Sequence, residues 1–396
     1  MKKKLTALAL ALVLVLSLCL AGCGGGGDTL TLNVYNWGEY ISDGSDGSLD
    51  TIKAFEQWYE ETYGQKVKVN YSTFASNEAK LKSGAVSYDV IIPSDYMIAR
   101  LREEEMLKPL NFDNIPNYQY IADSFKGLYY DETNEYSVPY TYGVVGIIMI
   151  FITIANVFVQ SGFSTALVQK KQADEVDFSS VCYFELAASV VFYALLYLVA
   201  PVIAEFYAIP VLKPIVRVLG IVVNTTDKAQ WEQALQSLLK QRPLVKAYVM
   251  DEIFNALEAG EASIGAYYAG DYFTMVDAQA ENVDLQFYYP EPTNYFVDAM
   301  CIPSCCENQE LAEIFINYML SEEPAIANAE YIWYASPNSL VYENETYQED
   351  MGEEAMEILY PDVTHFSEQY NKLAYRNLSN DMLDHMNSLW ETLKIN

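Results

Sequence analysis

One chain carries two patterns of hydrophobicity that a single folded domain rarely combines, and this mismatch limits what the chain can fold into. Residues 28–147 and 222–396 are acidic and rich in tyrosine, and their apolar residues recur at the spacings of helices and strands. Residues 148–221 are dominated by apolar side chains, and the runs 143–159 and 186–204 carry no charge. The outer parts predict an α/β fold, whereas long uncharged runs are typical of membrane-spanning helices.

The first residues have the features of a secretory signal peptide. Lys2–Lys4 precede a continuous apolar run, and the sequence Leu20-Ala21-Gly22-Cys23 then resembles a bacterial lipobox. This resemblance implies that residues 1–22 are removed and that Cys23 receives a lipid, with residues 23–29 as a glycine-rich tether. We therefore predict a protein anchored by lipid on the outer face of the cell membrane. An ordinary signal peptide with an incidental cysteine is the alternative.

The overall charge narrows the class of partner. The formal net charge is −31. A nucleic acid needs lysine and arginine to neutralise its phosphates, so we expect no nucleic-acid partner. A negative potential of this size favours a cationic ligand through long-range attraction, although many secreted proteins are acidic without binding a cation.

Residues that could support catalysis or metal binding are sparse. The two histidines, His365 and His385, stand in no nucleophile–base pattern, and Cys301, Cys305 and Cys306 lack metal-ligand spacing. A disulfide from Cys301 to either of the other two is compatible with an extracellular location. We expect no enzyme activity, no metal and no cofactor.

The first outer part predicts a parallel sheet. Strands are indicated around 30–34, 67–71 and 89–92. Between the first two strands we predict a helix that Ser48 caps and Gly64 ends, and between the second and third strands a helix that Ser76 caps. Strand–helix alternation favours parallel pairing, and ligands gather where such strands end. The segments that follow these predicted strands contain Trp37, Tyr40 and Tyr96.

The second outer part continues the same alternation. Asp227 is predicted to cap a helix that ends near Pro243, and strands are expected at 245–249, 263–268 (ending in a turn at Gly270), 285–289 and 296–302, with helices around 311–320 and 324–332. The last fifty residues are predicted to be mostly helical.

The apolar segment has two interpretations. The run 186–204 is long enough to cross a bilayer, and 143–159 is marginal. If both cross, Lys170-Lys171 between them faces the cytoplasm, as positively charged loops prefer. The alternative is that both runs are buried helices or strands of the folded lobe.

The aromatic and acidic residues at the predicted strand ends suit a slender organic cation. Aromatic faces attract cations and cover methylene groups, and carboxylates accept charge-assisted hydrogen bonds from ammonium groups. Tyr267, Tyr268 and Phe296 add aromatic faces from the second part. Asp298 lies two residues after Phe296, so both side chains point to the same side of a strand.

These segments resemble a known family. YNWGEY, SYDVIIPSDYM and YSVPYTYGVVGI before the apolar segment, and EASIGAYYAGDY, NYFVDAMCIP and YASPNSLV after it, are similar to the spermidine/putrescine-binding proteins of bacterial ABC importers. The resemblance implies a type II periplasmic-binding-protein fold with two hinged lobes, a polyamine ligand and delivery to permease subunits in the membrane.

Carried over by position, the resemblance assigns ligand contacts residue by residue. The implied contacts are Trp37, Tyr40, Ser94, Tyr96, Tyr268, Phe296, Asp298 and Tyr334, with Arg376 or Asn377 as a further polar contact. Tyr268 and Phe296 stand where the family often has tryptophan. Asp298 matches the carboxylate that holds an amine.

The middle of the chain departs from the family. Acidic ligand residues that the family draws from this part of its second lobe are absent, and residues 148–221 instead resemble a fragment of a polysaccharide or oligosaccharide flippase. We therefore expect a chimeric chain with weakened or absent polyamine binding. One alternative is a binding protein of the same fold for another solute, such as a sugar or a chelated ferric ion. The other is a chimeric chain that carries a fragment of a polysaccharide flippase.

The resulting domain prediction is a disrupted two-lobe protein. Residues 30–142 form the first lobe, to which residues 296–335 return. An apolar and helical insert occupies 143–221. The second lobe is built from the residues that remain, 222–295 and 336–396.

Overall fold

The computed structural model of the chain describes most of both outer parts. The described residues are 29–73, 87–151, 224–249, 252–259, 261–277, 284–289, 293–361 and 366–395. The signal peptide, Cys23, the helix predicted after Ser76 and residues 152–223, which include the run 186–204, lie outside these ranges.

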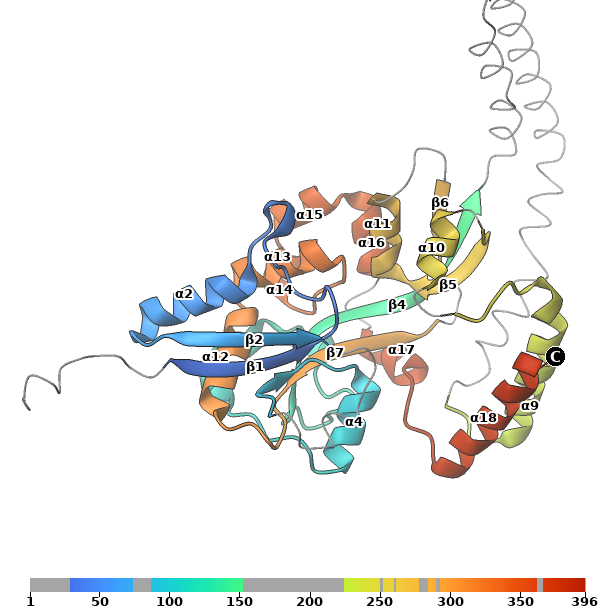
Figure 1. The fold of residues 1–396 in the computed structure, drawn as a ribbon, viewed down its shortest axis with the longest axis horizontal. Coiled ribbons are helices and arrows are strands. Elements are labelled where there is room, and N and C mark those ends of the chain that lie inside the picture. The colour runs from blue at the N-terminus through green and yellow to red at the C-terminus, as the bar shows by residue number, and fades with distance from the viewer. Residues whose placement is uncertain are drawn as a thin grey trace, which may run out of the picture.

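Seven strands form one mixed sheet, and it has the α/β architecture predicted from the sequence (Figure 1). β1 pairs in parallel with β2 and β3, whereas β7 runs antiparallel to β3 and β4. The strand order is β2-β1-β3-β7-β4-β5, and β6 pairs with β4. The strands are β1 (Leu30–Asn36), β2 (Val67–Thr73), β3 (Val90–Ile91), β4 (Ser137–Phe151), β5 (Ile264–Tyr268), β6 (Asp284–Tyr288) and β7 (Tyr295–Cys301).

The long strand β4 joins the two ends of the sheet. Its first half, Ser137–Val144, pairs with β7, and its second half pairs with β5 and β6. Figure 1 shows β4 running through the middle of the molecule between these neighbours. The prediction of a helix from residue 143 is therefore wrong for residues 143–151. These apolar residues form a strand because neighbouring strands on both sides of β4 pair with their backbone groups.

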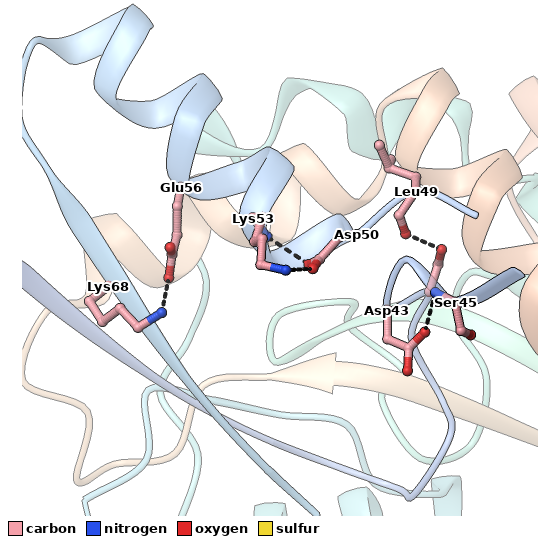
Figure 2. A network of polar contacts seen from close by, with 8 residues as sticks. Asp43, Ser45, Leu49, Asp50, Lys53, Glu56 and Lys68 are labelled. Carbon is pink, nitrogen blue, oxygen red and sulfur yellow. Dashed lines mark hydrogen bonds and ion pairs between the residues drawn. The ribbon is translucent and has the colours of Figure 1, made fainter. Parts of the chain in front are cut away.

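Helix α2 (Thr51–Tyr63) is held at its start by polar contacts (Figure 2). Asp50, and not the predicted Ser48, caps it: one carboxylate oxygen accepts from the Lys53 amide at 3.0 Å, and the other pairs with the Lys53 ammonium at 2.7 Å. Farther along, Glu56 pairs with Lys68 of β2 at 3.1 Å. Gly64 ends the helix with φ 68°, as predicted.

Aromatic side chains fill the core beneath α2. Phe55 is fully buried, and its ring lies 4.9 Å from the ring of Phe315 and 5.3 Å from that of Tyr318. Both partners belong to α12 (Gln309–Met319). In Figure 1, α2 and α13 (Glu322–Ile332) lie on one side of the sheet, and α4 (Asp95–Glu103) and α17 (Phe366–Leu373) lie on the other.

Of the remaining helices, α10 and α11 contact the strands β5 and β6, and α9 and α18 pack against each other. Asp227 caps α9 by accepting from the Ala229 amide, as predicted. Residues 245–249 form no strand, and α11 begins at Ala269 in place of the turn predicted at Gly270. Figure 1 shows α9 and α18 side by side at one end of the molecule. The helices are α9 (Lys228–Gln241), α10 (Glu252–Glu258), α11 (Ala269–Asp277), α14 (Ser339–Tyr342), α15 (Glu345–Met351), α16 (Glu353–Leu359) and α18 (Asn380–Ile395).

Within the described ranges, no helix combines the length and the apolar character needed to span a bilayer. Of the first run predicted to span, residues 143–151 are strand and 152–159 lie outside the described residues. The assignment of residues to two lobes stays a prediction.

Candidate ligand-binding site

Several of the predicted contacts lie in the segments that follow the ends of the strands β1 and β3, beside β7. β1 ends at Asn36, whose fully buried amide donates to the Tyr40 carbonyl at 3.1 Å and accepts from the Trp37 amide at 2.8 Å. These two bonds shape the loop that carries Trp37 and Tyr40. Beyond the end of β3, Ser94 forms a backbone bridge with Asp298 in the middle of β7. The loop after β1 and the residues after β3 therefore lie beside β7.

Asp298 is the central acidic residue among these segments. Its side chain is 4% exposed, and Oδ2 accepts from the Tyr40 hydroxyl at 2.7 Å. Burial raises the pKa of Asp298 to about 6, and the hydroxyls of Ser94 and Tyr40 only partly oppose that rise. Oδ1 has no hydrogen-bond partner among the described residues. This oxygen can accept a hydrogen bond from a cationic ligand.

An aromatic row extends from Asp298 toward β5. The ring of Tyr40 lies 5.5 Å from that of Tyr334, which lies 6.1 Å from Phe296. Phe296 in turn lies 5.4 Å from Tyr268 at the end of β5. These spacings fall in the range of favourable aromatic contacts. The structure thus brings five of the eight predicted contacts into one connected group with Asp298 at one end.

A second carboxylate, which the sequence reasoning missed, touches the same row. The Tyr334 hydroxyl donates to Asp271 Oδ2 at 2.7 Å, and Asp271 is half-buried in the first turn of α11. A side chain at Gly270 would meet the Tyr334 ring at 2.5 Å, so glycine there allows the close approach. The spacing of three between Tyr268 and Asp271 was the available signal, but a turn was expected where the helix begins.

The other predicted contacts flank this group. Tyr96, 39% exposed, lies in the first turn of α4 next to Asp95, and its carbonyl accepts from the Asn377 amide at 3.0 Å. The Arg376 guanidinium lies 5.0 Å from the ring centre of Tyr129. Of the two candidates near the C-terminus, Asn377 is therefore the one that contacts a predicted site residue. Trp37 is half-buried in the loop after β1, and its carbonyl accepts from the Tyr71 hydroxyl at 3.3 Å.

Cysteine and acidic residues form no other recognisable site in the part of the chain that the structure describes. Cys301, Cys305 and Cys306 are all unpaired, so the disulfide considered from the sequence is not formed. No cluster of three histidine, cysteine, aspartate or glutamate residues in these ranges could hold a metal ion.

Comparisons with known proteins identify the family. A spermidine/putrescine-binding periplasmic protein of Haemophilus influenzae is 30% identical over 74% of this chain and 72% of its own length. The corresponding protein of Salmonella typhimurium is 29% identical over 78% of each chain. The chain belongs to this family of periplasmic binding proteins.

A solved structure supports the same conclusion for the fold. The spermidine/putrescine ABC transporter substrate-binding protein of Streptococcus pneumoniae matches with a TM-score of 0.63 and 26% identity, covering 93% of this chain and 99% of that one. As a periplasmic binding protein by family, this chain is a binding protein and not an enzyme. The mixed α/β sheet of this chain agrees with the periplasmic-binding-protein fold of that relative.

The family assignment does not account for the whole chain. A model of a polysaccharide biosynthesis protein family also matches residues 138–270. This match contains the segment that resembles a flippase fragment, and it extends into the strands and helices described on its C-terminal side. A second family model therefore matches the middle of this periplasmic-binding-protein chain.

Proposed function

We propose that this chain captures a polyamine, spermidine or putrescine, outside the cytoplasmic membrane and delivers it to the permease subunits of an ABC importer. A lipid on Cys23 would hold it at the membrane surface. The family membership and the periplasmic relatives support this role. The observation that carries it is the free Oδ1 of buried Asp298 at one end of the aromatic row.

The geometry suits a flexible chain with an ammonium group at each end. One ammonium group of the polyamine would donate to Asp298, and the methylene groups of the polyamine would lie against Tyr40, Tyr334 and Phe296. A second ammonium group would approach Asp271, which already accepts from Tyr334 at 2.7 Å. Two carboxylates linked through tyrosines thus replace water around both charges.

The affinity is expected to be lower than that of an intact family member. The resemblance implies that acidic ligand residues which the family draws from the middle of its second lobe are missing here, because 148–221 resembles a flippase fragment instead. Asp271 supplies one carboxylate from this side, but it already binds the Tyr334 hydroxyl. A cation held by fewer carboxylates loses a charge-assisted hydrogen bond for each one missing.

Calorimetric titration of the full chain in mild detergent tests this function. Spermidine and putrescine should bind with dissociation constants above the micromolar range, and 1,4-butanediol, which has the putrescine length without its charges, should not bind. Asp298→Asn should weaken binding by at least ~thirtyfold, because truncating one partner of a buried charge pair costs about 2–5 kcal/mol.

Matched variants separate the two carboxylates from general destabilisation. Asp271→Asn should weaken binding less than Asp298→Asn, because Asp271 is half-buried and Asp298 is 4% exposed. Asp89→Asn is the control: Asp89 is 3% exposed and accepts from the Asn33 amide at the opposite end of β3. Heat from a sugar or a ferric chelate, and none from either polyamine, would reject the proposal.

A further inference from the structure

Another buried carboxylate, that of Asp95, contacts the backbone of two segments that carry predicted ligand contacts. Asp95, between the predicted contacts Ser94 and Tyr96, is 2% exposed. Its Oδ1 accepts from the Tyr96 amide at 2.6 Å, and its Oδ2 accepts from the Val297 amide at 3.3 Å. Val297 lies between Phe296 and Asp298. Asp95 therefore links the segment that carries Ser94 and Tyr96 to the strand that carries Phe296 and Asp298.

Asp95 and Asp298 form a pair of like charges. The backbone bridge between Ser94 and Asp298 places Asp95, which follows Ser94, on the segment beside β7. Each carboxylate is almost inaccessible to water, and the charge of Asp298 acts on Asp95. Two buried carboxylates that act on each other cannot both ionise without a cost in free energy.

The groups packed around Asp95 supply no compensating charge. Tyr370 of α17 donates its hydroxyl to Oδ2 at 2.5 Å, and the rings of Tyr129 and Tyr130, from the loop before β4, lie on the same side. The charge of Asp298 on β7 also acts on Asp95, and Asp298 itself accepts from the Tyr40 hydroxyl. Among the described residues, no lysine, arginine or histidine forms an ion pair with either carboxylate.

Resting on the function proposed above, we propose that Asp95 is a positioning residue that makes capture of a cation proton-linked. In the empty site the Asp95–Asp298 pair retains protons. When a ligand ammonium group reaches Asp298, it supplies the missing positive charge, and the retained protons leave to water. The ammonium group keeps its own proton throughout, because the pKa of an alkylamine is about 10.

The electrostatics of the two groups agree with this arrangement. Burial, and then the neighbouring Asp298, raise the pKa of Asp95 to about 7, although Tyr370 and two backbone amides oppose the rise. Burial raises the pKa of Asp298 to about 6. Both carboxyl groups therefore change protonation between mildly acidic and neutral pH, where a lone exposed aspartate is already ionised.

Calorimetry of the full chain with spermidine provides the test. Titrations in two buffers of different ionisation enthalpy, at the same pH near ~6.5, should differ in heat by the protons that binding releases. The dissociation constant should rise on acidification from about pH 8 to about pH 5, by roughly tenfold for each pH unit where one proton is released.

Variants distinguish positioning from mere support of the fold. Asp95→Asn should release fewer protons and flatten the pH profile, whereas Asp89→Asn, equally buried at the far end of β3, should keep the profile of the native chain. Asp95→Glu, which keeps the charge, should restore part of the pH dependence. Native binding with no proton release, or an Asp95→Asn profile identical to the native one, would overturn the inference and leave the proposed function standing. Absence of spermidine binding at every pH would overturn both.

Discussion

The two regions of the molecule bury their apolar residues to different degrees. The first region comprises β1, β2, β3 and β7 with α2, α4, α12 and α13, and Tyr63 and Tyr96 are its large exposed apolar side chains in the described ranges. The second region comprises β5 and β6 with α9, α10, α11 and α18 and their connecting segments. Its exposed side chains are Leu244, Val249, Ile264, Val276, Tyr288, Leu383, Trp390 and Ile395.

Both regions lie in the segments 28–147 and 222–396 that resemble the periplasmic binding proteins, but they differ in what adjoins them along the chain. The helices of the first region find the partners that their apolar faces require. The second region is interrupted by 152–223 between β4 and α9. Apolar side chains such as that of Leu244, which is 73% exposed, therefore lie in water and not in a core. The elements of the second region are therefore formed but leave large apolar side chains exposed.

The largest expected effect lies in the core of the first region. Phe55→Ala should lower the free energy of unfolding by about 3–5 kcal/mol, because it leaves a cavity beneath α2 beside Phe315 and Tyr318. Leu235→Ala, which truncates the buried residue of α9, should cost about 2 kcal/mol, at the low end for such a change. Urea denaturation measures both. Equal losses would break the comparison between the regions.

A smaller effect should come from the pH dependence of stability at Asp95. Its pKa is raised from 3.8 to about 7, so the folded chain holds this proton more tightly than the unfolded chain. The associated stability is complete below pH 3.8 and is lost as the pH rises through about 7. The native chain should lose a few kcal/mol more than Asp95→Asn across this window, because each tenfold difference in proton affinity between the folded and unfolded chains corresponds to ~1.4 kcal/mol.

Ligand-free denaturation at several pH values measures this difference. The same comparison with Asp89→Asn removes the contribution of the general negative charge, which grows with pH in every variant. Parallel stability curves for the native chain and Asp95→Asn would show that the first region tolerates the ionised pair. In that case burial around Asp95 is looser than its 2% exposure indicates.

The smallest effect is expected at the exposed residues of the second region. Leu244→Gln should change the free energy of unfolding by less than about 0.5 kcal/mol, because a side chain already in water loses little when it becomes polar. It should reduce self-association, which analytical ultracentrifugation measures. A large loss of stability would mean that Leu244 is covered in solution, and the contrast between the regions would then be smaller than the exposed fractions suggest.

Much of the fold could be read from local patterns. Alternating Leu30, Leu32 and Val34 give β1, and Gly64 ends α2 because only glycine adopts its positive φ without strain. The prediction failed where a partner far along the chain decides the structure. Residues 143–151 are uncharged and could belong to a helix, but β5 and β6, more than a hundred residues away, pair with them as a strand.

The candidate site divides in the same way. The sequence by itself determined the chemistry: an acidic chain with aromatic residues at strand ends, and Asp298 two residues from Phe296 on one face of β7. Only the tertiary structure decided that Asp271 joins this group through Tyr334 and that Asp95 contacts the backbone next to Asp298. The reason is physical: side-chain type follows from the sequence, whereas burial, a free carboxylate oxygen and the pairing of like charges arise only when distant segments are packed together.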